Sequence, residues 1–357
     1  MTQPRLSAVS LRLLAPSGPG APRRILVGAH ADSGDAGWAV CPDAAQRRET
    51  LERLGRALLG QAPSETNRRH HALGLAGSPH TQPGDLAPAG ALDNAVLDLA
   101  ARAAGVPLAL WLGGHVRTRV PVADRLAWAD APTALAGAAR VRWLVERAGA
   151  RVARHGFAAL TVVADGAEPP DVIALLGALR DAFDARVALR LELITFPNAA
   201  IGALVAPARA LGVAALIEPG IAASTGPDRA TVPIAVSVCP PLGEILRNGI
   251  AQIVRIASPQ HGGAAVAQRL AALARIYQAE VLLAGTSGLA IEAALLGQLA
   301  RAMPCDLQPL DLARDPTTLD GIAITDGALV LPDGPGIGVV PDPALLTRAE
   351  RLVEITP

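Results

Sequence analysis

The sequence predicts an α/β protein in which a barrel of alternating strands and helices follows a smaller α+β unit. The clearest sign is a set of three short apolar runs, Arg186–Ile194, Ala214–Pro219 and Val232–Cys239, each followed by Pro, Gly or small polar residues. Such runs are typical of parallel strands that are buried on both faces. The second sign is that strands and mostly helical connections alternate seven times after Val120. This alternation favours a barrel over an open sheet.

Residues before this alternating region are expected to form the α+β unit. Amphipathic spacing predicts a helix over Ala91–Ala104, which Gly105 and Pro107 end. The segment Gln61–Pro88 is rich in Pro, Gly, Ser and His, so it is expected to be a long loop with solvated histidines at 70, 71 and 80. The other predicted elements of this unit are strands over Leu6–Leu14 and Arg24–His30 and a helix over Ala45–Leu59.

The alternating region supplies the predicted barrel elements. Its helices are expected over Thr133–Arg154, Pro170–Phe183, Asn198–Leu211, Gly263–Tyr277 and Gly288–Met303. Its strands are expected over Val120–Asp124, Ala159–Ala164, Val187–Ile194, Ala214–Glu218, Ile234–Val238, Gln252–Ala257 and Glu280–Gly285. In an α/β barrel, the carboxyl ends of the strands carry the chemistry.

Composition narrows the classes of function. Basic and acidic residues balance at 32 each, which argues against a nucleic-acid partner. All basic side chains other than histidine are arginines, so no lysine is available as a Schiff-base former or general base. Three distant cysteines form no disulfide or zinc pattern. No run of about 18 apolar residues and no leader pattern occurs, so a cytoplasmic protein without a membrane partner is expected.

Four segments in order resemble the enolase superfamily, in the branch of mandelate racemase and muconate lactonizing enzyme. The resemblance covers nearly the whole chain. The segments are the helix Ala91–Ala104 with Gly105-Val106-Pro107 and Leu112-Gly113-Gly114, the pair Gly156-Phe157, the pair Gly262-Gly263, and Asp326-Gly327 through Pro332-Asp333-Gly334-Pro335-Gly336-Ile337-Gly338.

The resemblance implies a (β/α)7β-type modified TIM barrel with an α+β capping domain made of the N-terminal segment and the C-terminal tail. The expected boundaries are residues 1–118 for the N-terminal part of the cap, 119–318 for the barrel and 319–357 for the tail. It also implies Mg²⁺ held by three carboxylates at the ends of the third, fourth and fifth strands. In such enzymes the metal stabilises an enolate while side chains across the barrel remove a proton.

Most of the positions that the resemblance implies are altered in this chain. The metal positions fall on Glu192, Ile217 and Val238, so one carboxylate is kept, and Glu218 is the neighbour of Ile217 on the fourth strand. The base positions fall on Thr161, Val163 and Ala257, and no histidine lies in the seventh strand segment. We therefore expect a degenerate metal site, no Mg²⁺ and no other cofactor.

What remains at the strand ends is a set of arginines and one histidine. Period-two alternation places Arg190 on the face of Glu192, and Arg255 in the same interior, where it is expected to pair with Glu192 or to bind a small anion. Arg190, Arg255 and Arg125 are the candidate substrate-binding residues. Glu192, Arg255 and His261 are the candidate catalytic residues, although a solvent-facing His261 is also expected.

Three functions stay open on this basis. The first is a divergent, isomerase-like pseudoenzyme that binds a small carboxylate at the barrel mouth. The second is an active isomerase, such as a racemase or cycloisomerase, or a lyase such as a dehydratase, acting on a carboxylic acid with a rebuilt site. The third is a non-catalytic scaffold or oligomer subunit. A homo-oligomer is expected in each case.

Overall fold

The barrel is the centre of the molecule. The computed structural model describes residues 3–16, 23–77, 85–194, 196–219, 232–239, 241–258, 260–285, 287–312 and 322–357. Within these ranges, eight parallel strands close a barrel in the order β10-β11-β4-β5-β6-β7-β8-β9. They are β4 (Val122–Ala127), β5 (Ala159–Val163), β6 (Ala188–Glu192), β7 (Ala215–Ile217), β8 (Ile234–Ser237), β9 (Ile253–Ala257), β10 (Glu280–Ala284) and β11 (Leu310–Asp311).

Helices surround this barrel because each strand presents apolar side chains on its outer as well as its inner face. They are α5 (Gly137–His155), α6 (Pro169–Phe183), α7 (Asn198–Ala210), α8 (Leu242–Arg247), α9 (Ala264–Ile276) and α10 (Ala290–Ala302), with short 3₁₀ turns at Trp128–Asp130 and Asp184–Arg186. Outward-facing residues of β5 and β6 pack with α5, α6 and α7 in one hydrophobic cluster. Another cluster joins β9, β10, α9 and α10 to the cap.

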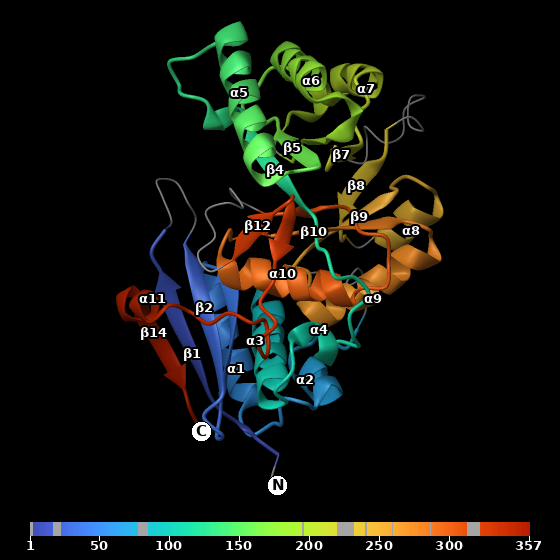
Figure 1. Cartoon of the computed structure of the whole chain (residues 1–357). Coiled ribbons are helices and arrows are strands. Elements are labelled where there is room, and N and C mark those ends of the chain that lie inside the picture. The colour runs from blue at the N-terminus through green and yellow to red at the C-terminus, as the bar shows by residue number, and fades with distance from the viewer. Residues whose placement is uncertain are drawn as a thin grey trace.

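The capping domain is built on an antiparallel sheet in the order β14-β1-β2-β3. Its strands are β1 (Leu6–Leu14), β2 (Arg24–Ala31), β3 (Ala36–Pro42) and β14 (Glu350–Ile355). Because β14 pairs with β1, the two ends of the chain meet in this domain (Figure 1). Its helices are α1 (Ala45–Leu58), α2 (Thr66–Ala72), α3 (Ala87–Ala103), α4 (Leu108–Trp111) and α11 (Pro343–Arg348), and a hairpin of β12 (Ala323–Thr325) and β13 (Ala328–Val330) precedes α11.

Helix α3 fastens the cap to the barrel. Its Asn94 side chain accepts the Ala264 N–H at the start of α9 at 2.7 Å and donates to Ser258 Oγ at 3.1 Å. Its buried Asp98 accepts backbone N–H groups from Trp38 of β3 and Ile337 of the tail, at 2.9 and 2.7 Å. Gly336 beside it has a φ of 70°, and an added Cβ there would lie 2.0 Å from Asp98 Oδ1, so only glycine fits.

Three parts of the sequence-based prediction are corrected here. The predicted loop Gln61–Pro88 contains helix α2, and His70 on that helix is buried, with Nε2 3.2 Å from Asp93 Oδ1. Arg69 Nε donates to the same oxygen at 2.7 Å, so these neighbours are ordered by one buried carboxylate. His71 is exposed as predicted, and His80 lies outside the described residues. Strands β3 and β11 were not predicted.

Within the described ranges, no helix is both long and apolar enough to cross a membrane.

Candidate functional site

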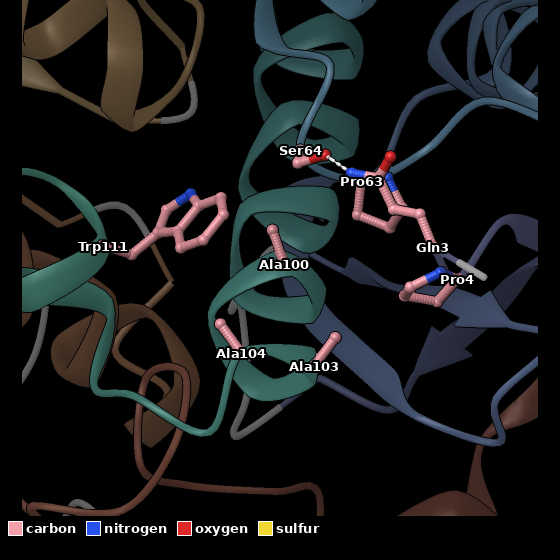
Figure 2. A pocket seen from close by; sticks show the side chains of 8 residues that line it. All are labelled: Gln3, Pro4, Pro63, Ser64, Ala100, Ala103, Ala104 and Trp111. Carbon is pink, nitrogen blue, oxygen red and sulfur yellow. Dashed lines mark hydrogen bonds between the residues drawn. The ribbon is translucent and has the colours of Figure 1, made fainter. Parts of the chain in front are cut away.

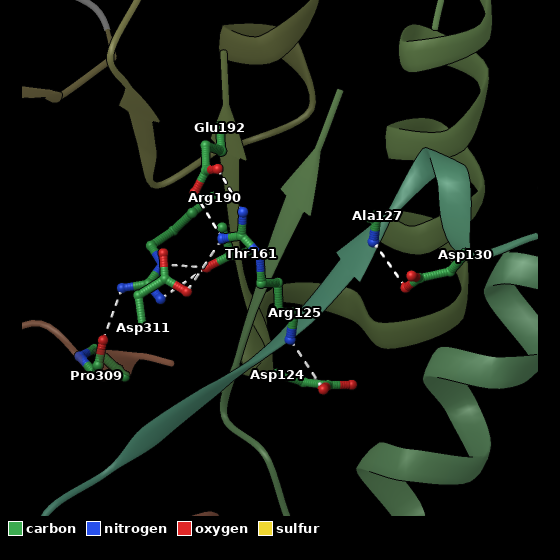
Figure 3. Close-up of polar contacts among 9 residues, drawn as sticks. All are labelled: Asp124, Arg125, Ala127, Asp130, Thr161, Arg190, Glu192, Pro309 and Asp311. Carbon is green, nitrogen blue, oxygen red and sulfur yellow. Dashed lines mark hydrogen bonds and ion pairs between the residues drawn. The ribbon is translucent and has the colours of Figure 1, made fainter. Parts of the chain in front are cut away.

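The barrel mouth is organised by Arg125 on β4. Side chains alternate along a strand, and Asp124 points outward, where its Oδ2 accepts from Arg151 Nε of α5 at 2.8 Å. Arg125 therefore points inward. Its Nη1 and Nη2 donate to Oε2 and Oε1 of Glu192 at 2.7 and 2.5 Å (Figure 3). This is a bidentate ion pair, the strongest geometry open to a guanidinium and a carboxylate.

A second buried carboxylate, Asp311 of β11, faces the same guanidinium. Its Oδ1 lies 3.5 Å from Arg125 Nη1, an ion pair without a hydrogen bond (Figure 3). Both Asp311 oxygens are buried, and neither has a hydrogen-bond partner among the described residues. Most buried polar groups have such a partner. Asp311 was absent from the sequence-based candidates because β11 contains only two residues and leaves no periodic signal.

Arg190 of β6 lies deeper in the interior and is fully buried. Its Nε and Nη2 donate to Thr161 Oγ1 at 3.1 and 2.8 Å, and its Nη1 donates to the Pro309 carbonyl at 2.9 Å. Burial lowers the pKa of Arg190, and the nearby charges of Asp311 and Glu192 oppose that shift. Arg190 therefore spans the interior from β5 to the segment that leads into β11.

Arg255 of β9 lies beside Ser237 in the strand register, and it does not pair with Glu192. This corrects the expected pairing, because Arg125 already holds both Glu192 oxygens. The Arg255 Nη1 donates to Ser237 Oγ at 3.4 Å, and its buried Nε has no hydrogen-bond partner within the described part of the chain. Arg255 acts on Glu192 through its charge alone.

The Glu192 carboxylate stays ionised in this setting. Burial alone would raise its pKa, but the hydrogen bonds and charge of Arg125, together with the charges of Arg255 and Arg190, lower the pKa below its ordinary value. A lowered pKa means that the ion pair stabilises the fold above the pKa of the unfolded side chain. That stabilisation is lost as the pH falls through the lowered value.

His261 is not the solvent-facing residue that the sequence led us to expect. The Ala257 N–H donates to His261 Nδ1 at 3.0 Å, so the neutral ring carries its proton on Nε2. Burial, and then the charge of Arg255, lower the pKa of His261 to about 4. The ring is therefore a neutral hydrogen-bond donor at physiological pH.

Stability should fall with acidification because of this histidine. The folded ring binds a proton at a pKa of about 4, whereas the unfolded side chain does so near 6.5, so the unfolded state is favoured as the pH drops between these values. From pH 7 to pH 5 the cost is about 2 kcal/mol. In His261→Asn the free energy of unfolding, measured by urea titration, should decline less over that interval. An unchanged decline would contradict the assignment.

Residues 235–345 match the family model described as enolase C-terminal domain-like. Among curated proteins, the chain is 28% identical over 284 residues to a Streptomyces coelicolor protein named "Probable glucarate dehydratase". That match covers 72% of this chain and 64% of the relative, so the chain spans less than two thirds of the relative's length.

Solved structures share the whole architecture. An isomerase from Streptomyces coelicolor A3(2) superposes with a TM-score of 0.82 at 23% identity, covering 97% of this chain and 96% of that one. A mandelate racemase/muconate lactonizing enzyme from Sulfitobacter sp. gives a TM-score of 0.81 at 22% identity, covering 96% and 94%. The chain therefore shares the fold of these structures, and about a third of it matches the enolase C-terminal domain-like family. The predicted barrel with its capping domain is thereby confirmed, and the match over residues 235–345 agrees with the resemblance seen in the sequence.

The residues present in this chain do not fit the Mg²⁺ that the resemblance implies. Glu192 has both oxygens bound to Arg125. Ile217 is fully buried in an apolar cluster with interior residues of β8, β9 and β10. No group of three or more His, Cys, Asp or Glu able to hold a metal ion occurs among the residues that the structure describes. Mg²⁺ requires several oxygen ligands in octahedral geometry.

The remaining positions near the implied metal site, Val238 and Glu218, also differ from the expectation. Ser237 is the interior residue at the end of β8, whereas Val238 follows the strand and packs against the main hydrophobic cluster. Glu218 follows β7 with a φ of 56°, an uncommon conformation outside glycine. The Glu218 Oε1 is buried without a hydrogen-bond partner among described residues. Burial raises the pKa of Cys239, and the charge of Glu218 raises it further.

A separate cavity lies in the capping domain, between α3, α4 and the start of the chain (Figure 2). Its volume is about 160 Å³. The lining consists of Gln3, Pro4, Pro63, Ser64, Ala100, Ala103, Ala104 and Trp111. It contains none of the candidate site residues and no ionisable side chain, so it offers no chemistry that the barrel mouth lacks.

Proposed function

We propose that this chain binds a small carboxylic acid at the mouth of the barrel, and that Arg255 receives the carboxylate. The observation that carries the proposal is the state of the Arg255 side chain. Its Nε is buried without a partner in the described ranges, and its hydrogen bond to Ser237 Oγ is long, at 3.4 Å. A carboxylate would accept two parallel hydrogen bonds from this guanidinium and remove the cost of burying its Nε without a partner.

His261 supports the same proposal. Its pKa is depressed partly by the charge of Arg255, so the two side chains are electrostatic neighbours. The neutral ring offers Nε2–H as a donor, which a bound anion would accept without adding a second positive charge beside Arg255. The site would therefore supply three kinds of donor to one anion, namely the Arg255 guanidinium, the His261 Nε2–H and the Ser237 hydroxyl.

We also propose that the superfamily's metal-assisted proton abstraction does not operate in this chain. The support is the chemistry of the side chains at the implied metal and base positions. Of the implied metal positions, Glu192 is bound to Arg125, and Ile217 carries no oxygen on its side chain. The chain also has no lysine to serve as a base. A reaction of that class would need ligands and a base that these residues do not provide.

A second candidate is an isomerase or lyase that acts on a carboxylic acid without a metal. The observation that favours it is Asp311, a buried carboxylate whose oxygens accept no hydrogen bond from described residues and could take a proton from a ligand. The names of two relatives, an isomerase and a glucarate dehydratase, point to the same classes of reaction. Exchange of a ligand's α-proton for deuterium, followed by NMR, would distinguish this candidate from simple binding.

The proposal is tested by titration calorimetry in EDTA with acetate, glycolate, malonate and glucarate. The wild type should bind at least one acid with 1:1 stoichiometry. Arg255→Ala should weaken that binding about 10- to 100-fold, as expected for hydrogen bonds to a charged group. Arg209→Ala, an exposed arginine on α7, should leave it unchanged.

Three results would count against the proposal. Equal binding by Arg255→Ala would remove Arg255 from the site. Binding that disappears in EDTA and returns with Mg²⁺ would restore the metal. No binding of any acid at millimolar concentration would favour the non-catalytic scaffold.

A further inference from the structure

One flank of helix α5 carries a row of three arginines. Arg140, Arg147 and Arg154 lie seven residues apart on this helix, so they share one face at intervals of about 10 Å along the helix axis. The Arg140 guanidinium lies over the Trp128 ring, 5.0 Å from its centroid, and the Arg147 guanidinium lies over the Trp143 ring at 5.7 Å. We call these three arginines, with the two tryptophans, the arginine row.

The arginine row lies on the side of α5 that faces away from α6. Val141, Arg142 and Val145 of α5 line a groove together with residues of α6, and about 100° of rotation per residue places the row roughly half a turn from them. The barrel neighbour on the row's own side would be a helix after β11, but β11 is followed by the hairpin strand β12 among the described residues. Figure 1 shows α5 at the edge of the barrel domain, with α6 beside it. The row is therefore a face of α5 without a partner helix in the described structure.

The positive charge of the row is not neutralised by the described part of the chain. Arg151, on the same side of α5, pairs with Asp124, but none of the three arginines of the row forms an ion pair with a described acidic residue. The Nε atoms of Arg140 and Arg147 are buried without a partner in the described ranges, because each side chain is held against an indole ring. Arg140 also donates to a backbone carbonyl at 3.3 Å through Nη2. The remaining Nη groups are therefore the donors that a binding partner would meet.

We propose that the arginine row docks an acidic helix of a partner protein, with Asp or Glu at every seventh position. A helix lying along α5 repeats its side chains at the same interval of about 10 Å, so each carboxylate would meet one guanidinium, as charged residues do at the flanks of coiled coils. An arginine stacked on an aromatic ring has its N–H groups fixed in one plane, and this geometry suits a carboxylate that accepts two hydrogen bonds. Covering Trp143, which is half-buried, would add apolar contact.

Two other occupants fit the row less well. Phosphates along a nucleic-acid strand repeat at less than half the interval of the arginines, and the balanced charge of the whole chain, 32 basic and 32 acidic residues, would not attract a long polyanion. A second copy of this chain lacks the complementary pattern, because no described helix carries two acidic residues seven positions apart. The row therefore favours a different protein as the partner.

The inference is independent of acid binding at the barrel mouth, since it uses none of those side chains. The probes are two helical peptides of the same alanine- and glutamine-rich composition, one with Glu at every seventh position and one with its Glu residues spread around the helix, together with an oligodeoxythymidine. Titration calorimetry at low ionic strength should show the first peptide binding at least about 10-fold more tightly than the second.

Replacing all three arginines of the row by glutamine should weaken binding of the first peptide about 10-fold or more, because each ion pair contributes a part of the affinity. Arg142→Gln, which changes an exposed arginine on the α6 side of the same helix, should leave that binding unchanged. Circular dichroism checks that the triple variant is folded. If it is not, Arg154→Gln, which changes an exposed side chain, should by itself weaken binding about 3-fold.

Several results would overturn the inference. Equal affinity for the two peptides would mean that charge is recognised without spacing. Unchanged affinity in a folded triple variant, or in Arg154→Gln where the triple variant does not fold, would remove the row from the binding surface. Tighter binding of the oligodeoxythymidine would favour a nucleic acid, and a wild-type dimer that the arginine substitutions dissociate in sedimentation would favour a second copy. No binding of the first peptide at millimolar concentration would leave the row without the proposed partner.

Discussion

Replacing Asp98 by alanine should lower the free energy of unfolding by about 3–5 kcal/mol, the range for removing one partner of a buried ion pair. The carboxylate is fully buried. It accepts Arg102 Nε at 3.0 Å and the backbone N–H groups of Trp38 and Ile337. Each N–H left without an acceptor costs about 1–3 kcal/mol, although these costs are not additive. Urea unfolding followed by circular dichroism measures the change.

The effect should also be local in origin, because Asp98 links β3, α3 and the C-terminal tail. Hydrogen exchange at Ile337 should therefore increase more than exchange in the barrel strands. Asp98→Asn keeps an oxygen acceptor and should cost less than Asp98→Ala. Asp181→Ala, on the exposed face of α6, should change stability by no more than about 0.5 kcal/mol. A loss below about 1 kcal/mol in Asp98→Ala would show that the link is not needed.

Replacing Arg190 by alanine should also cost about 3–5 kcal/mol, since a fully buried guanidinium then leaves its counter-charges behind. Three of its donors are used, two on Thr161 Oγ1 and one on the Pro309 carbonyl. Its charge also lowers the pKa of Glu192. Thermal and urea unfolding at pH 7 give the change directly. The variant should lose less stability relative to the wild type at pH values where Glu192 becomes protonated.

Arg190→Met separates the loss of charge from the loss of volume. It fills most of the space without a donor or a charge, so it should recover the part of the cost that comes from the cavity. Arg209→Ala on the exposed face of α7 controls for the loss of an arginine as such. If Arg190→Met were as stable as the wild type, the Arg190 guanidinium would have no net stabilising role. The charges of Glu192 and Asp311 would then be compensated by other side chains.

Barrel strands were predicted well because they leave local signals. Each is an apolar run bounded by small or turn-forming residues, and the predicted ranges overlap β4 to β10. Helix α2 and strand β11 were missed for the opposite reason. Arg69 and His70 appear solvated until Asp93, 23 or more residues away, supplies a buried carboxylate. Strand β11 has two residues, and its pairing with β4 and β10 arises only when the barrel closes.

At the site, the period-two rule placed Arg190 and Glu192 on one face, and both are buried. It did not say which arginine would reach Glu192. Along the chain, Arg125 precedes Glu192 by 67 residues and Arg255 follows it by 63. Both arginines occupy strand positions that face the barrel interior. The choice depends on which strands are neighbours and on how they are staggered, which no local pattern contains.

The sequence by itself determined the barrel, its resemblance to the enolase superfamily and the absence of lysine, because these depend on residue type and on short-range spacing. Only the tertiary structure decided that Arg125 takes Glu192, that Asp311 joins them, and that Arg255 is left with a buried Nε. Those facts depend on distances between side chains from different strands. Electrostatic energies in a buried site change steeply over a few ångströms, so its chemistry follows from the geometry of the closed barrel.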